Sequence, residues 1–374
     1  MDTTKASMSE SHKDVVELLL THHADVDKAD TEGWTPLKLA CQNGHKDVVE
    51  LLLTHHADVD KADNEGWTPL KLACQNSHKD VVELSLTHYA DVDKADNEGW
   101  TPLHTACSTD YKDIAELLLI YKANVNTQNK NGWTPLKIAC QNGHKDVVEL
   151  LLTHHADVDK AGNNRSTPLY IACQNGLKDV VVLSIASADI DKAGNEGRTP
   201  LLTACNKDYK DVAELLLKHT ANVNKQNKNG SPPLHIACQY GHKDFVEPLL
   251  SHHADVDKGD NEGWTPLHTA YGNGYKDIAE LLLIHKTNVN QQNKNGSTAL
   301  KLACLNDHKD VVEFLLARNA DIDKANHKGW TPLHQACNDG YNDIAELLVM
   351  YKANVHYQNK NGSTPIKLAC QYRE

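Results

Sequence analysis

The chain of 374 residues carries 38 basic and 51 acidic side chains, with a formal net charge of −13. Its 40% apolar and 24% charged residues are typical of a folded protein, which excludes a disordered chain. The acidic excess argues against sequence-independent nucleic-acid binding, which depends on clustered Lys and Arg. Apolar stretches such as Val180–Leu183 are far too short to cross a bilayer. Residues 1–10 contain no apolar signal-peptide region, so we expect neither membrane insertion nor secretion.

A 33-residue period dominates the sequence. Glycines at this spacing are followed by Trp-Thr-Pro-Leu at Gly33, Gly66, Gly99 and Gly132, and the period resumes from Gly197 after one slip. Such a period predicts one array of stacked units. We expect a partial repeat at 1–32, ten repeats at 33–65, 66–98, 99–131, 132–164, 165–196, 197–229, 230–262, 263–295, 296–328 and 329–361, and a partial repeat at 362–374.

Each unit is expected to contain two short helices and a loop. In the unit from Gly66, Thr68 is a natural N-cap and Pro69 suits the first helical position, which predicts an inner helix ending near Asn76. An outer helix follows from His78, with Val81, Val82, Leu84 and Leu86 facing neighbouring units. The turn formers of residues 96–99 predict the tip of a hairpin-like finger.

The predicted outer helices begin, in chain order, at His12, His45, His78, Tyr111, His144, Leu177, Tyr209, His242, Tyr275, His308 and Tyr341. The copy from Leu177 lacks one residue before Asp189, and Pro248 lies inside another outer helix, where a proline is expected to kink the helix at a cost of about 3 kcal/mol. We expect both places to be weak points of the array.

The repeat resembles the ankyrin repeat, whose T-P-L-H-x-A motif is present at Thr101–Ala106 and again at Thr265–Ala270. The resemblance covers essentially the whole chain. It implies an all-α repeat protein, an ankyrin-type α-solenoid of helix-turn-helix units with β-hairpin-like fingers. It also implies that partners bind the finger tips and the concave face of the inner helices.

Two departures from the ankyrin motif stand out. Lys replaces the motif His at Lys38, Lys71, Lys137, Lys301 and Lys367. Non-glycine residues occupy the left-handed position at the end of the outer helix, where the family usually has Gly. They are His23, His56, Tyr89, Lys122, His155, Thr220, His253, Lys286, Asn319 and Lys352. Each is expected to cost roughly 1 kcal/mol, which predicts an array less stable than a consensus one.

All ten cysteines occupy one inner-helix slot that predicts small buried residues, with Tyr271 in the same slot of one repeat. Packed helices lie about 8–10 Å apart, beyond the roughly 7 Å Cα separation of a disulfide. We therefore expect free thiols in a reducing compartment, the cytoplasm, with the nucleus as an alternative.

The sequence contains no complete motif for a catalytic, metal-binding or nucleotide-binding site. His104 and Cys107 stand three apart like a nucleophile pair, but no third orienting residue accompanies them. Adjacent histidines such as His22 and His23 do not converge on one zinc ion. Gly272-Asn273-Gly274 lacks the strand and third glycine of a nucleotide-binding loop. We expect no enzyme activity, metal or cofactor.

The predicted binding surface is a ladder of aromatic and charged residues along fingers and inner helices. It comprises Trp34, Trp67, Trp100, Trp133, Trp264 and Trp330, beside Lys38, Lys71, His104 and Lys137, with acidic tips at Glu32, Glu65 and Glu98. Trp is a favoured interface anchor, and an acidic edge suits a basic, partly apolar protein. The alternative interpretation is that each Trp packs under its own finger and was copied with the repeat.

Two functions follow. The first is a non-enzymatic, monomeric protein-binding scaffold. The second is the targeting arm or a fragment of a larger ankyrin-containing protein such as a channel, kinase or effector, because neither end of the array carries the polar cap that solenoids usually need.

Overall fold

The computed structural model describes residues 13–371, which form helices and turns without a β-strand. The predicted all-α repeat fold is confirmed. These residues divide into two compact units, one ending at Asp189 and one beginning at Ile190. The expected outer-helix start at His12 lies outside the described residues.

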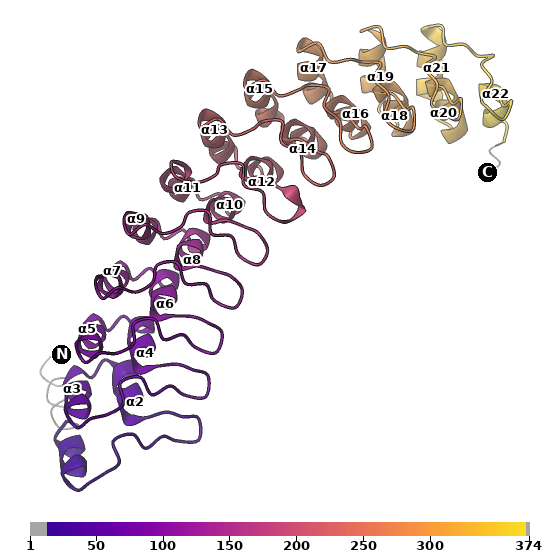
Figure 1. Ribbon diagram of the computed structural model, residues 1–374. Coiled ribbons are helices and arrows are strands. Elements are labelled where there is room, and N and C mark those ends of the chain that lie inside the picture. Colours follow the sequence, from indigo (N-terminus) through magenta and orange to yellow (C-terminus); the bar gives the residue numbers. More distant parts are fainter. Residues whose placement is uncertain (1–12, 372–374) are drawn as a thin grey trace, which may run out of the picture. The chain divides into compact units, whose positions relative to one another are not determined.

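In the first unit an outer helix over residues 13–21 precedes five helix pairs. The inner helices are α2 (Pro36–Asn43), α4 (Pro69–Gln75), α6 (Pro102–Ser108), α8 (Pro135–Asn142) and α10 (Pro168–Gln174). The outer helices are α3 (Lys46–Thr54), α5 (Lys79–Thr87), α7 (Lys112–Ile120), α9 (Lys145–Thr153) and α11 (Lys178–Ile185). Within this unit the outer helices form one row and the inner helices a second row, from which the fingers extend on the far side (Figure 1).

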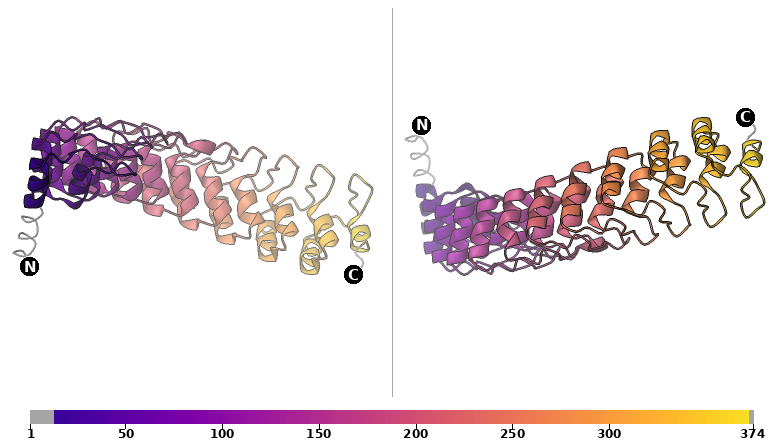
Figure 2. Two further views of the ribbon diagram at one scale, coloured as in Figure 1. Left: turned by 90° about the horizontal axis from the view of Figure 1, so that it is seen from below. Right: turned by 90° about the horizontal axis from the view of Figure 1, so that it is seen from above.

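The second unit repeats this plan after the short 3-10 turn η1 (Asn195–Gly197). Its inner helices are α12 (Pro200–Lys207), α14 (Pro233–Tyr240), α16 (Pro266–Gly272), α18 (Ala299–Leu305), α20 (Pro332–Asp339) and α22 (Pro365–Ala369). Its outer helices are α13 (Lys210–Lys218), α15 (Lys243–Ser251), α17 (Lys276–Ile284), α19 (Lys309–Leu316) and α21 (Asn342–Met350). Within each unit, an inner helix packs against the next inner helix and its own outer helix, and Figure 2 shows the repeats side by side.

The inner helices begin where the sequence predicts. Thr68 has an extended backbone, its hydroxyl oxygen accepts the Lys71 N–H at 3.2 Å, and Pro69 is the first helical residue. The helix ends at Gln75, next to the predicted Asn76. α14 differs because Pro232 takes the cap position and offers no side-chain acceptor.

The outer helices bury one face, as expected. Val81, Val82 and Leu86 of α5 are buried, but Leu84 is half-exposed and Ser85 takes its place in the buried face. The Ser85 hydroxyl donates to the Val81 carbonyl at 2.8 Å, which satisfies its hydrogen-bonding need within the helix.

The cysteine slot is buried from Cys41 to Cys304, and Tyr271 is fully buried in the same slot. Cys337 is half-buried and Cys370 is exposed, so the prediction of burial is wrong for Cys370. No helix within residues 13–371 packs on α22 from the side away from α20, which leaves Cys370 uncovered.

The left-handed positions are confirmed. All ten non-glycine residues predicted there have φ between 60° and 70°. Even Tyr89, which has a large aromatic side chain, has a φ of 66°. Ser77, Asp110, Asp208 and Asp307 are also left-handed, at inner-helix ends where other repeats have glycine. Since a left-handed backbone is unfavourable for side chains with a Cβ, these positions support the expectation of a less stable array.

Pro248 does not interrupt its helix. α15 runs over nine residues, the length of α3 and α9, with Pro248 at its sixth position. The proline removes only its own N–H, while buried Phe245 and Leu249 hold the helix on its neighbours.

Candidate protein-binding site

Each finger turn fixes the tryptophan that follows it. In the finger before α4, one oxygen of Asp63 accepts the backbone N–H of Glu65 at 3.0 Å and of Trp67 at 2.8 Å. Gly66 closes the turn with a φ of +84°, which favours glycine. Because Thr68 then caps α4, the indole of Trp67 is held between the finger and the inner helix.

The six tryptophans of this slot are all half-buried. Trp34, Trp67, Trp100 and Trp133 occupy consecutive repeats of the first unit, and Trp264 and Trp330 lie in the second unit. Each indole therefore packs against its own finger and still presents part of its ring outward. This geometry is compatible with both interpretations of the tryptophans, as a partner-binding surface and as side chains that pack under their own fingers.

The predicted surface lysines are not on the surface. Lys38, Lys71 and Lys137 are 0%, 1% and 0% exposed, and their ammonium groups lie 4.7, 4.2 and 4.6 Å from the ring centroids of the tryptophans four positions earlier. Lys38 forms an ion pair with Asp63. For Lys38 and Lys71 the next finger supplies a carboxylate that compensates the buried charge, and the indole beside each ammonium adds a cation–π contact.

Lys71 repeats this arrangement with Asp96, which belongs to the finger after its own. Burial lowers the pKa of Lys71, and the ion pair with Asp96 opposes that shift. The prediction that these lysines are exposed is therefore wrong. Their ammonium groups lie against the rings of Trp34, Trp67 and Trp133.

His104 is also buried, contrary to expectation. Its Nδ1 accepts the Thr101 N–H at 3.1 Å, and its Nε2–H donates to the Trp133 carbonyl at 2.9 Å. Burial lowers the pKa of His104 to about 4. The neutral ring thus links α6 to the next finger and supports Trp100, whose ring centroid lies 5.8 Å away.

Sequence reasoning missed a pairing between each motif residue and the next finger. The facing position stands 25 residues later, where Lys38 and Lys71 meet aspartates and where Asn occurs instead after His104, His268 and His334. The pairing fails at Lys137, whose facing residue is Gly162, and at the buried Lys301, which faces Asn326, while His235 faces Asp260. The Lys137 ammonium donates to Asn164 Oδ1 at 3.2 Å, and burial lowers its pKa to about 8.

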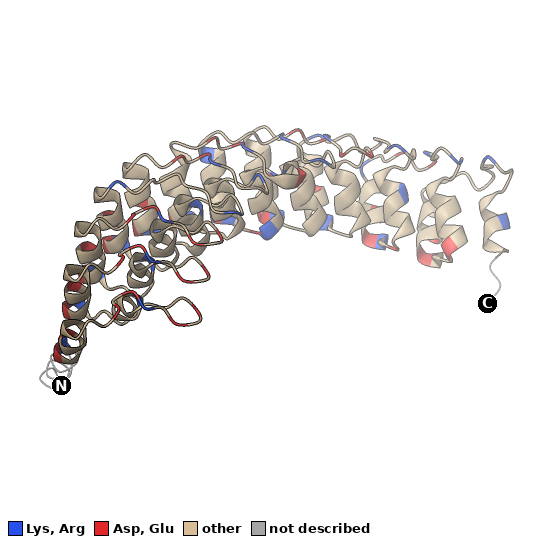
Figure 3. Cartoon of the chain, turned by 60° about the horizontal axis from the view of Figure 1, so that its bottom comes forward, with Lys and Arg blue, Asp and Glu red and all other residues tan. Residues whose placement is uncertain are grey.

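The acidic tips are exposed, as predicted. Glu32, Glu65 and Glu98 follow the turn aspartates, and Figure 3 shows acidic residues on the fingers nearest the N-terminus. Glu98 lies 3.9 Å from the exposed Lys130 ammonium. Within residues 13–371 no cation lies within 4 Å of the carboxylates of Glu32 or Glu65.

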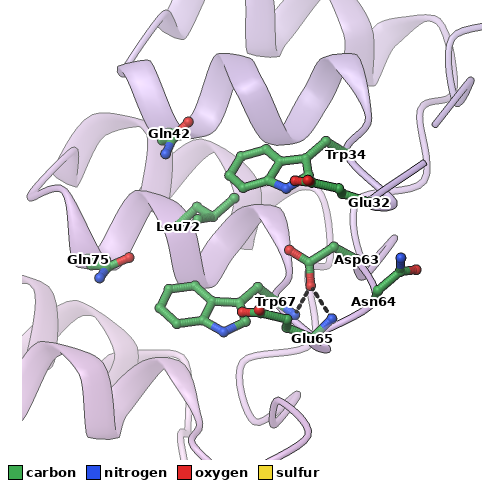
Figure 4. A pocket seen from close by; sticks show the side chains of 9 residues that line it. All are labelled: Glu32, Trp34, Gln42, Asp63, Asn64, Glu65, Trp67, Leu72 and Gln75. Carbon is green, nitrogen blue, oxygen red and sulfur yellow. Dashed lines mark hydrogen bonds between the residues drawn. The ribbon is translucent and has the colours of Figure 1, made fainter. Parts of the chain in front are cut away.

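Two consecutive grooves join these elements. The first has a volume of about 550 Å³ and is lined by Glu32, Trp34, Gln42, Asp63, Asn64, Glu65, Trp67, Leu72 and Gln75. In Figure 4 the indoles of Trp34 and Trp67 lie one above the other with Leu72 between their levels, the acidic residues on the finger side and the glutamines opposite. The second groove, of about 350 Å³, is lined by Trp67, Lys71, Gln75, Asp96, Glu98, Trp100, Thr105, Ser108 and Thr109.

Comparison with known proteins gives the family. The family model of ankyrin repeats in three copies matches ten overlapping segments that together span residues 4–374. The chain belongs to the ankyrin repeat family. The ankyrin repeat domain of human ASB11 is a similar solved structure, 28% identical, with a TM-score of 0.50 over 55% of this chain and 92% of that chain. Among curated proteins no sequence matches the chain.

Ankyrin repeats are generally protein-interaction scaffolds. In this ankyrin array the second unit offers a different groove surface from the first. One groove there, of about 290 Å³, has Trp264 beside Asp260 and the buried His235, and another, of about 110 Å³, carries Arg198 and Ser231 in the slot that holds Trp in the first unit.

His235 is the least satisfied motif residue of the array. Neither ring nitrogen has a hydrogen-bond partner. Nδ1 lacks one because Pro232 replaces the capping threonine, and Nε2 lies 4.0 Å from Asp260 Oδ2. Burial lowers the pKa of His235, while the Asp260 charge raises it by a smaller amount.

The alternative chemistries find no support in the geometry. Both nitrogens of His104 are engaged in hydrogen bonds, and burial raises the pKa of the Cys107 thiol, so this pair is not poised as base and nucleophile. The Nδ1 atoms of His22 and His55 bond to carbonyls of their own helices. No cluster of three or more potential metal ligands occurs in the described part of the chain, and none of its helices has the length and apolarity that spanning a membrane requires.

Proposed function

We propose that this ankyrin array is a non-enzymatic protein-binding scaffold whose partner occupies the tryptophan-lined grooves of the first unit. The observation that carries the proposal is the repetition of one groove design in neighbouring repeats. The two grooves share Trp67 and Gln75, and their other tryptophans and acidic tips are related by the 33-residue period.

The proposed contacts are the indole edges of Trp34, Trp67, Trp100 and Trp133 and the carboxylates of the tips. Half-buried indoles on rigid supports suit interface anchors, because little conformational entropy is lost when they are covered. Glu32 and Glu65 lack a cation within the described part of the chain, which supports a basic, partly apolar partner. Trp264 and Trp330 carry less weight in the proposal, since Trp264 is the one tryptophan in the lining of its groove and Trp330 lines none of the grooves described above.

The test is capture of a partner from cell lysate by the whole chain and by two matched variants. Trp67→Ala with Trp100→Ala removes the shared wall of both grooves, whereas Trp264→Ala with Trp330→Ala removes the same residue type from the second unit. We expect the first variant to lose at least about tenfold of the captured protein and the second to keep it. Circular dichroism of both variants checks that the helices are retained. Equal capture by all three proteins would contradict the proposal.

Two further properties belong to this proposal. Eight cysteines are free and buried, which supports residence in a reducing compartment such as the cytoplasm or the nucleus. We further propose a monomer, because the grooves of the first unit are complete within one chain. Light scattering at several concentrations measures the mass, and a dimer at low concentration would contradict this.

A further inference from the structure

We propose that the two first-unit grooves bind a polyproline II segment that carries an arginine at every third residue. This inference rests on the proposed function, because it specifies the partner of the same surface. It follows from the spacing of the grooves, their charge, and the unpaired amides along one wall.

The spacing of the grooves favours this conformation. Adjacent packed helices lie about 8–10 Å apart, and α2, α4 and α6 set the step from one groove to the next. A polyproline II helix has three residues per turn and rises about 3.1 Å per residue, so side chains three apart share one face about 9.3 Å apart. Same-face side chains of a β-strand repeat at about 6.7 Å, which does not match the step.

The fingers favour the same register. The Asn64 N–H donates to the Glu32 carbonyl at 3.1 Å, and the Asn97 N–H donates to the Glu65 carbonyl at 3.0 Å. These bonds join successive fingers in one register, so the tips advance in step with the helices. The tryptophans and glutamates of successive fingers are therefore expected to advance by the same step along the first unit.

Charge favours a cation in each groove. Asp63 and Asp96 are already paired with Lys38 and Lys71, so the charges deep in the grooves cancel. The tip glutamates remain. Among residues 13–371, Glu32 and Glu65 of the first groove have no cation within 4 Å, and Glu98 of the second groove has only a weak, exposed pair with Lys130 at 3.9 Å. A guanidinium suits this place better than an ammonium, because its plane stacks on an indole and its two edges bind a carboxylate.

The amides of the opposite wall favour an open backbone. Gln42 and Gln75 line the grooves one repeat apart, and their side-chain amides have no hydrogen-bond partner among residues 13–371. A polyproline II backbone has no internal hydrogen bonds, so its carbonyls can accept one glutamine amide per turn. An α-helix with arginines seven apart advances about 10.5 Å, close to the step, but its backbone groups are bonded internally.

The second unit supplies a natural contrast. Its smaller groove has Arg198 and Ser231 in the tryptophan slot and no acidic lining residue. Such a groove repels a guanidinium and offers no indole to stack on. This groove is therefore excluded as a site for the proposed ligand, and the groove of Trp264 and Asp260 offers one binding position where the first unit offers two consecutive ones.

The test compares labelled peptides of equal composition by fluorescence anisotropy with the whole chain, at physiological salt. One peptide repeats Arg-Pro-Pro four times, and its isomer has the four arginines in one block followed by the prolines. A third is a helical peptide with arginines seven apart. We expect the first to bind at least about tenfold more tightly than the other two. Glu32→Gln with Glu65→Gln should weaken its binding about tenfold, whereas the same-slot control Glu196→Gln with Glu262→Gln should leave it unchanged.

The outcomes separate this inference from the proposed function. Equal binding of the two isomers, or tighter binding of the helical peptide, would overturn the polyproline II inference. No binding of any peptide would also overturn it. In each case the loss of lysate capture on changing Trp67 and Trp100 still decides the proposed function independently. Unchanged affinity for the Arg-Pro-Pro peptide in that tryptophan variant would overturn the polyproline II inference, and only unchanged lysate capture would overturn the proposed function.

Discussion

A lysine fully buried among apolar helices is costly unless its charge is compensated. Lys38 and Lys71 obtain this compensation from the next finger, through Asp63 and Asp96, and from the indole faces beside them. The same slot holds His104, whose neutral ring needs only a carbonyl acceptor, and there the next finger has Asn129. In these repeats the buried residue and the facing finger residue are matched, whereas Lys301 faces Asn326 and donates instead to Gln335 at 3.1 Å.

Lys137 faces a glycine in place of an aspartate, and it gives a test at the level of one residue. Gly162→Asp should supply the missing carboxylate and raise the free energy of unfolding near pH 7 by about 1–2 kcal/mol. A Cβ at this position would stand closest to the flexible end of Lys137, which can shift toward the new carboxylate. It would also lie 3.2 Å from the Gly132 carbonyl oxygen, which must give by a few tenths of an ångström. Urea denaturation measures the gain.

The matched control is Gly162→Asn, which can cap the finger turn but adds no charge. It should stabilise less than Asp. The pH dependence gives a second readout, because the folded-state pKa of Lys137 is about 8 against its ordinary 10.5. Wild-type stability should therefore rise with pH between these values, and the Asp variant should lose that rise. An Asp variant no more stable than the Asn variant would refute the pairing.

The buried histidines predict acid sensitivity. Burial lowers the pKa of His104, His235, His268 and His334 from the ordinary 6.5, to about 4 for His104. The unfolded chain then binds more protons than the folded chain below pH 6.5. The free energy of unfolding therefore has its full value above pH 6.5. It decreases as the pH falls below 6.5, by up to about 1.4 kcal/mol per pH unit for each histidine.

The measurement is the urea midpoint between pH 7 and 4.5 for the wild type and two single variants. His104→Leu copies the leucine that the chain has at position 202 and should flatten the pH dependence. His45→Gln changes an exposed residue and should leave the slope unchanged. Equal slopes for all three proteins would contradict the assignment of acid sensitivity to the buried rings.

At the level of elements, sequence alone predicts the helices well because their signals are local. The Thr-Pro pair begins α4, and the non-glycine position after each outer helix is left-handed, as the motif implies. The inward turn of Lys38 was not predictable in this way, since its partner Asp63 lies 25 residues away in another repeat. Only the placement of the next finger shows why that lysine is buried.

Pro248 shows that an unfavourable residue can be tolerated within a helix. The other outer helices have Leu or Phe at this position, and α15 keeps its length despite the lost N–H. Pro248→Leu should therefore stabilise the second unit, by up to about 3 kcal/mol. Thermal denaturation followed by circular dichroism measures the shift, with Leu281→Pro in α17 as the reciprocal variant, which should be destabilised. A lower melting temperature for Pro248→Leu would show that the site is packed around the proline ring.

At the scale of the molecule, the repeat period predicts the architecture, because every unit buries its apolar face against the next. It does not predict the grooves. Trp34 and Trp67 are the same residue at the same position of the repeat, so the sequence does not show how far each is exposed. Their partial exposure depends on how a buried lysine and a finger turn support each ring. Copies of one motif therefore acquire different surfaces when a few finger residues change, as the contrast between Trp67 and Arg198 shows.

The slip in the period predicts that α11 is the least stable helix of the array. The outer helix α11 ends without a left-handed residue, because the missing residue falls between Ser187 and Ala188, and the compact units divide in the same loop at Asp189. α11 also buries Ser184 where α9 buries Leu151. Deuterium exchange of the whole chain should show amides of α11 exchanging at least about tenfold faster than those of α9.

Inserting one histidine between Ser187 and Ala188 tests the cause. The insertion restores the 33-residue period and the left-handed end that His155 provides after α9. Exchange in α11 should slow toward that of α9, while exchange in α3 and α17, several repeats away, should remain unchanged because repeats couple mainly to their neighbours. Fast exchange that persists after the insertion would assign the weakness to the missing leucine, and Ser184→Leu in the inserted chain would then be the change that slows it.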